Sequence, residues 1–98
     1  MRAEEVMRAR YSAYATADEA YLLDSWHPDT RPPGMTFPAD MEWLGLAVGE
    51  VRRGDKLDAD ATVAFEARFR DSDGTFTLAE NSIFERSNGV WVYRDALP

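Results

Sequence analysis

The stretch DATVAFEARFRDSDGTFTLAENSIFE, residues 60–85, gives the strongest structural signal in the chain. Apolar and polar residues alternate on both sides of its short SDG turn, a pattern typical of an antiparallel hairpin with one buried face. One register places Phe69 opposite Phe76, whereas a slip by one residue places Phe69 opposite a threonine. Because cross-strand aromatic pairs stabilise a sheet, we expect the first register, with one face mainly apolar.

This register also turns a carboxylate and a hydroxyl toward the apolar face. Phe65 lies opposite Glu80, and Val63 lies opposite Ser82. A carboxylate among apolar side chains must be paired, hydrogen-bonded or protonated, since an isolated buried charge costs much free energy. Glu80 is therefore the residue most informative about function.

A last strand is predicted after the dipeptide Asn88-Gly89, which favours a two-residue hairpin turn. The turn leads into residues 90–95 and places Tyr93 on the apolar face. The same offset sets Asp95 opposite Ser82. We therefore expect a second carboxylate on that face.

The residues before the hairpin predict one more strand and two helices. Residues 42–53 are strand-like, and residues 3–15 carry apolar side chains at three- and four-residue steps. Asp18 is the N-cap of a second helix, which His27-Pro28 should end because proline disfavours helical geometry in the residue before it. The proline-rich residues 29–40 form an extended connector. The fold class is α+β: N-terminal helices packed on a curved antiparallel β-meander with a cone-shaped interior.

Composition limits what the chain can bind. Its length fits one domain, residues 1–98, and 11 Lys plus Arg against 18 Asp plus Glu give a formal net charge of -7. That charge disfavours nucleic acid and anionic membranes as partners. With no Cys and one His, disulfides and Cys/His zinc sites are excluded, and we expect no metal and no cofactor. The charged N-terminus MRAEEVMRAR lacks the apolar core of a signal peptide, which predicts a cytoplasmic protein.

A family resemblance rests on four segments that occur in order and cover nearly the whole chain: MRARYSAYATADEAYLLDSWHP, EWLGLAV, VAFEARFRD and AENSIFERSNGVWVYRDA. Together they resemble the central domain of the YchJ-like family, which belongs to the nuclear transport factor 2-like, cystatin-like superfamily. The resemblance implies an α+β cone and no established activity. It also implies association with Cys-rich SEC-C zinc motifs, which longer members carry beside this domain. At residues 79–84 the chain reads AENSIF where the family usually reads HERSRF, so outward basic residues are missing while the inward Glu, Ser and Phe remain.

Glu80 and Arg10 form the predicted centre of a site. Arg10 borders the apolar stripe of the first helix, and a guanidinium can bind a carboxylate through two parallel hydrogen bonds. One interpretation is a structural ion pair that holds the helix on the sheet. The other is catalytic, since a carboxylate in an apolar cone can act as general acid or base with a raised pKa, as in cone-shaped isomerases and hydrolases of the superfamily that the chain resembles.

The predicted ligand-binding residues are those expected to face the cone: Arg10, Tyr11, Tyr14, Trp26, Glu80, Ser82 and Tyr93. Glu80 is the catalytic candidate among them. Asp95 is a second carboxylate, with the alternative of an exposed residue near the chain end. His27, the sole imidazole, is a candidate proton carrier, with the alternative of helix capping or packing beside Trp26.

Two main functions follow. The leading hypothesis is a ligand-binding or protein-interaction module without chemistry, in which the cone takes a small apolar molecule or is filled, and the outer face of the sheet pairs with a second copy or another protein. The alternative is a cofactor-free acid/base enzyme, of isomerase or hydrolase type, that acts on a small organic substrate, with Glu80 as base and Tyr11 or Tyr14 as hydrogen-bond donor. It requires an open cavity beside Glu80. A third hypothesis, by analogy with the longer relatives, is an accessory to SEC-C zinc modules.

Overall fold

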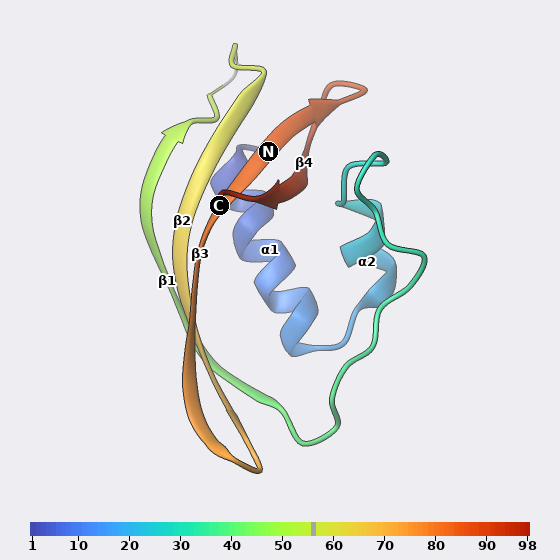
Figure 1. Ribbon diagram of the computed structural model, residues 1–98. Helices are drawn as coiled ribbons and strands as arrows, with labels where there is room; N and C mark the ends of the chain where they lie inside the picture. The colour runs from blue at the N-terminus through green and yellow to red at the C-terminus, as the bar shows by residue number, and fades with distance from the viewer. Residues whose placement is uncertain (56) are drawn as a thin grey trace.

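The computed structural model describes residues 1–55 and 57–98 and contains the predicted elements (Figure 1). In these residues two helices, α1 (Ala3–Ala15) and α2 (Glu19–Asp24), precede four strands: β1 (Glu42–Arg53), β2 (Asp60–Asp71), β3 (Gly74–Ser87) and β4 (Val90–Ala96). The strands form one antiparallel sheet in the order β1-β2-β3-β4. α1 lies in the hollow of the curved sheet, between the sheet and α2 (Figure 1). The predicted α+β class and the meander are confirmed.

Capping interactions hold both helices at their predicted starts. At α1 the Glu5 carboxylate accepts a hydrogen bond from the backbone N–H of Arg2. At α2 the Asp18 carboxylate accepts one from the backbone N–H of Tyr21. Each bond satisfies a donor that the first helical turn leaves without an intrahelical partner. Neither helix in the described part of the chain is long and apolar enough to cross a membrane.

α2 ends earlier than the proline signal predicted. The helix stops at Asp24, where the prediction placed its end at His27. Ser25 Oγ donates back to a carbonyl of the last turn, and Trp26 leaves the helix to form a parallel bridge with Tyr93 of β4. The helix therefore ends where the chain makes contact with the sheet, three residues before the end that Pro28 predicted.

The central hairpin has the predicted register. Phe69 pairs with Phe76, and Phe65 pairs with Glu80. In the following turn Asn88 and Gly89 both have left-handed backbone, with φ of 51° and 82°. A type I′ hairpin turn requires this geometry, which asparagine and glycine adopt at low cost.

The last strand departs from the predicted register near its end. Phe84 pairs with Tyr93 as predicted, but a register shift follows, and Asp95 pairs with Ile83 instead of Ser82. A one-residue shift turns the later side chains of a strand to the opposite face. Asp95 is exposed, so the prediction that it shares the apolar face with Glu80 is wrong.

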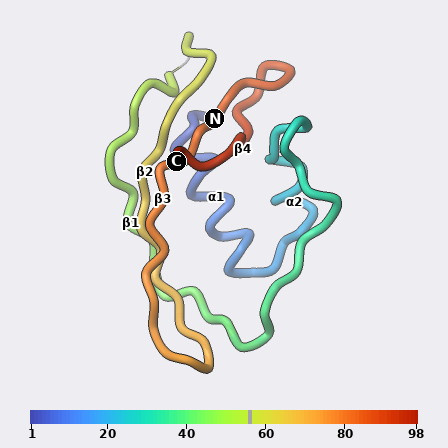
Figure 2. Tube along the Cα trace, in the orientation of Figure 1, coloured from blue at the N-terminus to red at the C-terminus, as the bar shows by residue number. Residues whose placement is uncertain are grey.

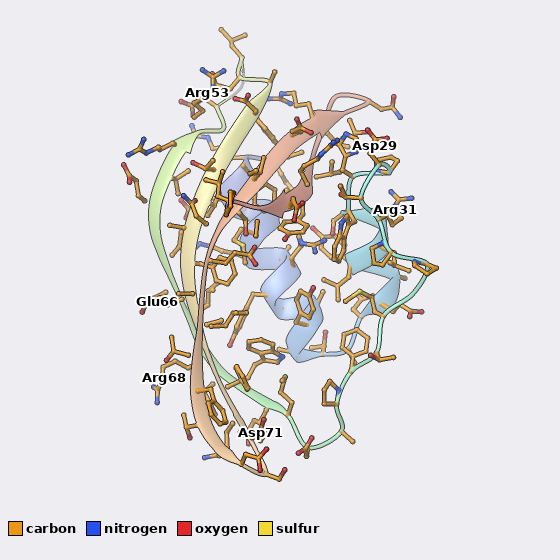
Figure 3. The ribbon with its side chains drawn as sticks, viewed as in Figure 1. Asp29, Arg31, Arg53, Glu66, Arg68 and Asp71 are labelled. Carbon is orange, nitrogen blue, oxygen red and sulfur yellow. The ribbon has the colours of Figure 1, made fainter. Side chains whose placement is uncertain are left out.

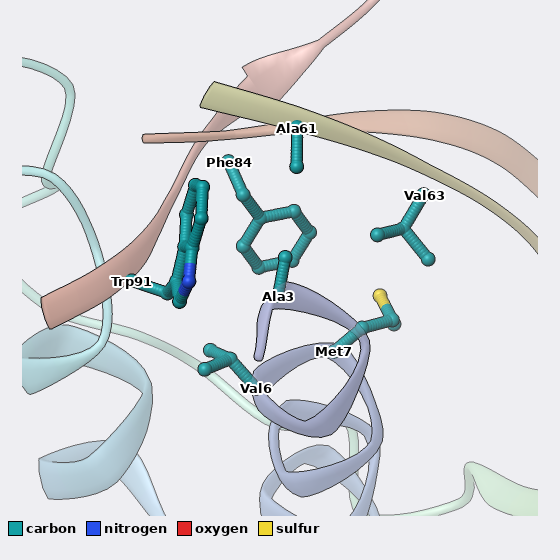
Figure 4. Close-up of a cluster of buried hydrophobic side chains, with 7 residues drawn as sticks. All are labelled: Ala3, Val6, Met7, Ala61, Val63, Phe84 and Trp91. Carbon is teal, nitrogen blue, oxygen red and sulfur yellow. The ribbon is translucent and has the colours of Figure 1, made fainter. Parts of the chain in front are cut away.

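The hydrophobic core fills one end of the cone, which we call the closed end (Figure 4). It consists of seven buried side chains from α1, β2, β3 and β4: Ala3, Val6, Met7, Ala61, Val63, Phe84 and Trp91. Phe84 and Val63 have 0% exposed surface. Full burial of one such side chain contributes about 1.5–3 kcal/mol, so this cluster holds α1 on the sheet.

The other end of the sheet extends beyond α1 (Figure 2). We call the tip of the β2–β3 hairpin around Phe69, Phe76 and Leu78 the open end, because Phe76 and Leu78 are 44% and 43% exposed. On the outer face of the sheet, Glu66 and Arg68 point away from the helices (Figure 3). Pairing of that face with a second copy stays a prediction.

Candidate functional site

A cavity of about 230 Å³ lies between α1 and the concave face of the sheet, where the closed end meets the open end. Its apolar walls are Met7, Tyr11, Tyr14, Trp43, Phe65, Ala67 and Leu78. Tyr11 meets Trp43 edge to face, with 5.8 Å between ring centroids. The interior of the cone therefore contains space that side chains do not fill.

The polar side of the cavity is centred on Glu80, which is half-buried. Its Oε2 accepts hydrogen bonds from Ser82 Oγ at 2.5 Å and from the Tyr93 hydroxyl at 3.3 Å. Within the described residues Oε1 accepts no hydrogen bond. Burial, and then the charge and hydrogen bond of Glu80, raise the pKa of the Tyr93 phenol above its usual value. Tyr93 therefore stays a neutral donor at physiological pH.

Arg10 does not pair with Glu80, and the prediction of that ion pair is wrong. Arg10 is 3% exposed, and its Nη1 donates to the Leu22 carbonyl at 2.9 Å and to Ser25 Oγ at 2.8 Å. Both acceptors lie at the end of α2, which packs against α1. The hydrogen bonds of the guanidinium thus go to the end of α2 and not to Glu80 of the sheet.

Aromatic rings and phenols make up the remaining surroundings of Arg10. Its guanidinium carbon lies 4.9 Å from the Trp26 ring centroid and 4.6 Å from that of Tyr93, within the range of cation–π attraction. Burial lowers the pKa of Arg10, while the phenols of Tyr14, Tyr93 and Tyr21 act in the opposite direction. Among the described residues, no carboxylate lies within ion-pair distance of the Arg10 guanidinium.

Six of the seven predicted ligand-binding residues line this cavity: Arg10, Tyr11, Tyr14, Glu80, Ser82 and Tyr93. Trp26 does not line it, and instead packs edge to face against Tyr93 with 5.1 Å between centroids. The binding of a ligand by this set stays a prediction. The set lacked Trp43, because β1 is apolar on both faces and its alternation does not say which face points inward.

His27 lies away from the cavity, on the side of β4 and the connector. Its Nδ1 accepts the backbone N–H of Asp29 at 3.1 Å, and both ring nitrogens lie 3.3–3.4 Å from Nη1 of Arg94. These contacts join the connector to the sheet, which fits the structural interpretation of His27. Across residues 1–55 and 57–98, no cluster of three or more His, Cys, Asp or Glu could hold a metal ion.

Known proteins are similar to this chain in sequence and in fold. Residues 2–96 match the family described as YchJ, middle NTF2-like domain. The chain is 41% identical over 93 residues to the UPF0225 protein SCO1677 of Streptomyces coelicolor, which covers 95% of this chain and 72% of that protein. It is 45% identical over 98 residues to a UPF0225 protein of Xanthomonas campestris pv. campestris, covering 96% of this chain and 74% of that protein. These names state no activity.

Two solved structures are similar in fold. The solution structure of RPA3114, a SEC-C motif containing protein from Rhodopseudomonas palustris, has a TM-score of 0.80 and 27% identity, covering 98% of this chain and 77% of that one. The crystal structure of a SEC-C motif containing protein from Psychrobacter arcticus has a TM-score of 0.71 and 25% identity, covering 100% of this chain and 62% of that one. The cone of two helices on a curved sheet is therefore a shared fold.

Proposed function

The chain belongs to the family of YchJ middle NTF2-like domains, and from that premise we propose that its cavity binds one small, mainly apolar organic molecule. The observation that carries the proposal is a cavity of about 230 Å³ whose apolar walls surround a few polar groups. Ligand sites in proteins have this composition, because a few placed polar groups orient a ligand that apolar walls hold. The function is that of a binding module with no demonstrated chemistry.

The volume of the cavity limits the size of the ligand. Since a water molecule occupies about 30 Å³ in the liquid, a space of about 230 Å³ has room for about eight waters, or for an organic molecule with a similar number of non-hydrogen atoms. Pockets for drug-sized ligands enclose roughly 300 to 1,000 Å³. The ligand is therefore a small metabolite-sized compound and not a nucleotide.

Glu80 orients such a ligand in this proposal. Its Oε2 is occupied by Ser82 and Tyr93, whereas Oε1 has no hydrogen-bond partner among the described residues. A hydroxyl or amine on the ligand can donate to Oε1, and the resulting charge-assisted hydrogen bond is stronger than one between neutral groups.

Ligand screening by NMR tests the proposal. We expect some members of a library of small aromatic and aliphatic compounds to shift the backbone amide signals of Tyr11, Phe65 and Glu80. Ala67→Phe should abolish these shifts, because Ala67 is 2% exposed and lines the cavity, which the larger ring would occupy. Ala79→Phe, at an exposed position on the other face of the sheet, is the matched control and should leave them unchanged. Binding that survives Ala67→Phe, or a library without any binder, would refute the proposal.

Acid/base catalysis is a second candidate, favoured by the open Oε1 of Glu80 and by its lack of an ion pair with Arg10. Glu80 then removes a proton from the bound molecule, and a tyrosine on the wall donates to the developing negative charge. In D2O, a bound compound with an acidic C–H bond should exchange deuterium at least about 100-fold faster with the natural protein than with Glu80→Gln. Equal exchange in the two proteins would rule out Glu80 as base.

We also place the protein in the cytoplasm in this proposal. The support is that the first residues of the sequence are part of the folded domain, since Ala3, Val6 and Met7 of α1 lie in its core. Fractionation of the native host with an antibody tests it, and recovery of the protein outside the cytoplasm would refute it.

A further inference from the structure

Arg10 is a buried cation without a counterion among the described residues. Its Nη1 bonds to a carbonyl and a hydroxyl, and its guanidinium lies over two aromatic rings. None of these partners carries a negative charge. A buried charge that is only partly compensated costs free energy, so the site favours any molecule that supplies the missing charge.

A buried donor beside Arg10 has no acceptor among the described residues. Arg10 itself donates through Nη1 to the Leu22 carbonyl and the Ser25 hydroxyl, and Tyr14 is a further hydrogen-bond partner of its side chain. The indole Nε1 of Trp26, whose ring centroid lies 4.9 Å from the guanidinium carbon, is buried without a partner among the described residues. Buried donors in native proteins are nearly always satisfied. Trp26 lies outside the cavity lining, whereas Arg10 lines the cavity and is the cation that a ligand there can reach.

We infer that the ligand of the cavity is a small monocarboxylate whose carboxylate is held by Arg10. Arg10 lines the cavity together with the aromatic walls of Tyr11, Trp43 and Phe65, so that a carboxylate at the guanidinium leaves the apolar body of the ligand against these rings. A guanidinium matches the planar carboxylate through parallel N–H donors. The inference rests on the proposed function and adds the chemical class of the ligand.

The charge distribution favours a monoanion over a phosphate. Glu80 lines the same cavity, and the chain has a formal net charge of -7, so a dianion meets repulsion that one arginine does not offset. Phosphate sites usually combine several donors or a helix N-terminus, whereas Arg10 is the one cation in the lining of this cavity among the described residues. A single carboxylate fits this set.

Matched ligands on the natural protein test the inference without any substitution. Benzoate and benzamide have the same shape and differ in charge, and phenylphosphonate carries the competing phosphate-like group. We expect benzoate to bind at least about tenfold more tightly than benzamide in NMR titrations, and phenylphosphonate to bind more weakly than benzoate. Benzoate should also shift the side-chain Nε signal of Arg10.

Other outcomes separate the inference from the function on which it rests. If benzamide binds as tightly as benzoate, the inference that the ligand is a carboxylate is wrong, and the cavity binds neutral ligands. If phenylphosphonate binds more tightly than benzoate, the inference is wrong and the ligand carries a phosphate-like group. Failure of all three, together with every neutral compound of the library, overturns the proposed function as well.

A substitution at Arg10 locates the contact. Arg10→Met keeps a long apolar stem and should reduce the benzoate preference over benzamide to about onefold. Arg8→Met, at an exposed position on the same helix, should keep the preference. If Arg10→Met does not fold, Arg10→Lys keeps the charge but loses the planar fork, and should retain only part of the preference. A preference that is unchanged in the folded Arg10 variant assigns the carboxylate to another group and overturns the inference.

Discussion

The closed end and the open end of the cone are built from the same strands, yet they differ in burial. On β3, Phe84 at the closed end is 0% exposed, whereas Phe76 at the open end is 44% exposed. Both side chains belong to the same alternating set on the concave side of the sheet. The difference arises because α1 covers Phe84 through the closed-end core, and the hairpin tip extends beyond α1 (Figure 2).

Alternation therefore decides which face of a strand is apolar, but the helices decide how much of that face is covered. The cavity lies at the boundary, with Met7 of the core on one side and Leu78 of the open end on the other. Open space exists there because α1 ends at this point, whereas the apolar concave face of the sheet continues beyond it. The candidate site is a consequence of a helix that is shorter than the sheet it covers.

The largest expected effect compares the same residue type at the two ends. Phe84→Ala should lower the free energy of unfolding by about 3–5 kcal/mol, since it removes a fully buried ring and leaves a cavity. Phe76→Ala should lower it by less than about 1 kcal/mol, because much of that ring is already in water. Urea denaturation of both variants measures the difference. Equal losses would mean that the open end is covered in solution.

A smaller effect is expected at Arg10, which joins α1 to α2 above the cavity. Arg10→Met should lower the free energy of unfolding by about 1–3 kcal/mol, because the buried Leu22 carbonyl and Ser25 hydroxyl lose a charged donor. Arg8→Met is the control, since its exposed ion pair with Glu4 is worth about 0.3–0.5 kcal/mol. Thermal and urea unfolding of both variants measure the contrast. A loss at Arg10 no larger than at Arg8 would contradict the role of Arg10 in fixing α2.

The smallest effect concerns alkaline pH at the cavity wall. The pKa of Tyr93 is raised in the folded protein, so the folded state keeps a proton that the unfolded chain loses above pH of about 10. The stabilisation by this group is therefore complete below that pH and decreases as the pH rises further. In Tyr93→Phe the melting temperature should fall less steeply above pH of about 10.

Tyr21 provides the comparison for that experiment. Burial raises the pKa of Tyr21 too, so part of the alkaline destabilisation should remain in Tyr93→Phe. Melting curves of the natural protein, Tyr93→Phe and Tyr21→Phe between neutral and alkaline pH measure the two contributions. An unchanged slope in Tyr93→Phe would contradict the shifted pKa.

The sequence alone determined the elements of this protein and the direction in which most strand residues point. The pairing of Phe65 with Glu80 follows from a period of two, which the backbone enforces, and from a hairpin whose other register is less favourable. The Asp18 cap and the Asn88-Gly89 turn are equally local, since a few neighbouring residues decide their geometry. Local pattern is therefore enough to place Glu80 on the concave side of the sheet.

The contacts of the inward residues depend on how distant segments pack together. The long side chain of Arg10 can reach several acceptors. In the structure its guanidinium donates to a carbonyl and a hydroxyl of the α2 end, and not to Glu80. One register shift after Phe84 turned Asp95 outward, and a bridge to Tyr93 ended α2 before Pro28. Backbone direction repeats with a local period, whereas the partner of a long side chain depends on which groups from distant segments pack around it.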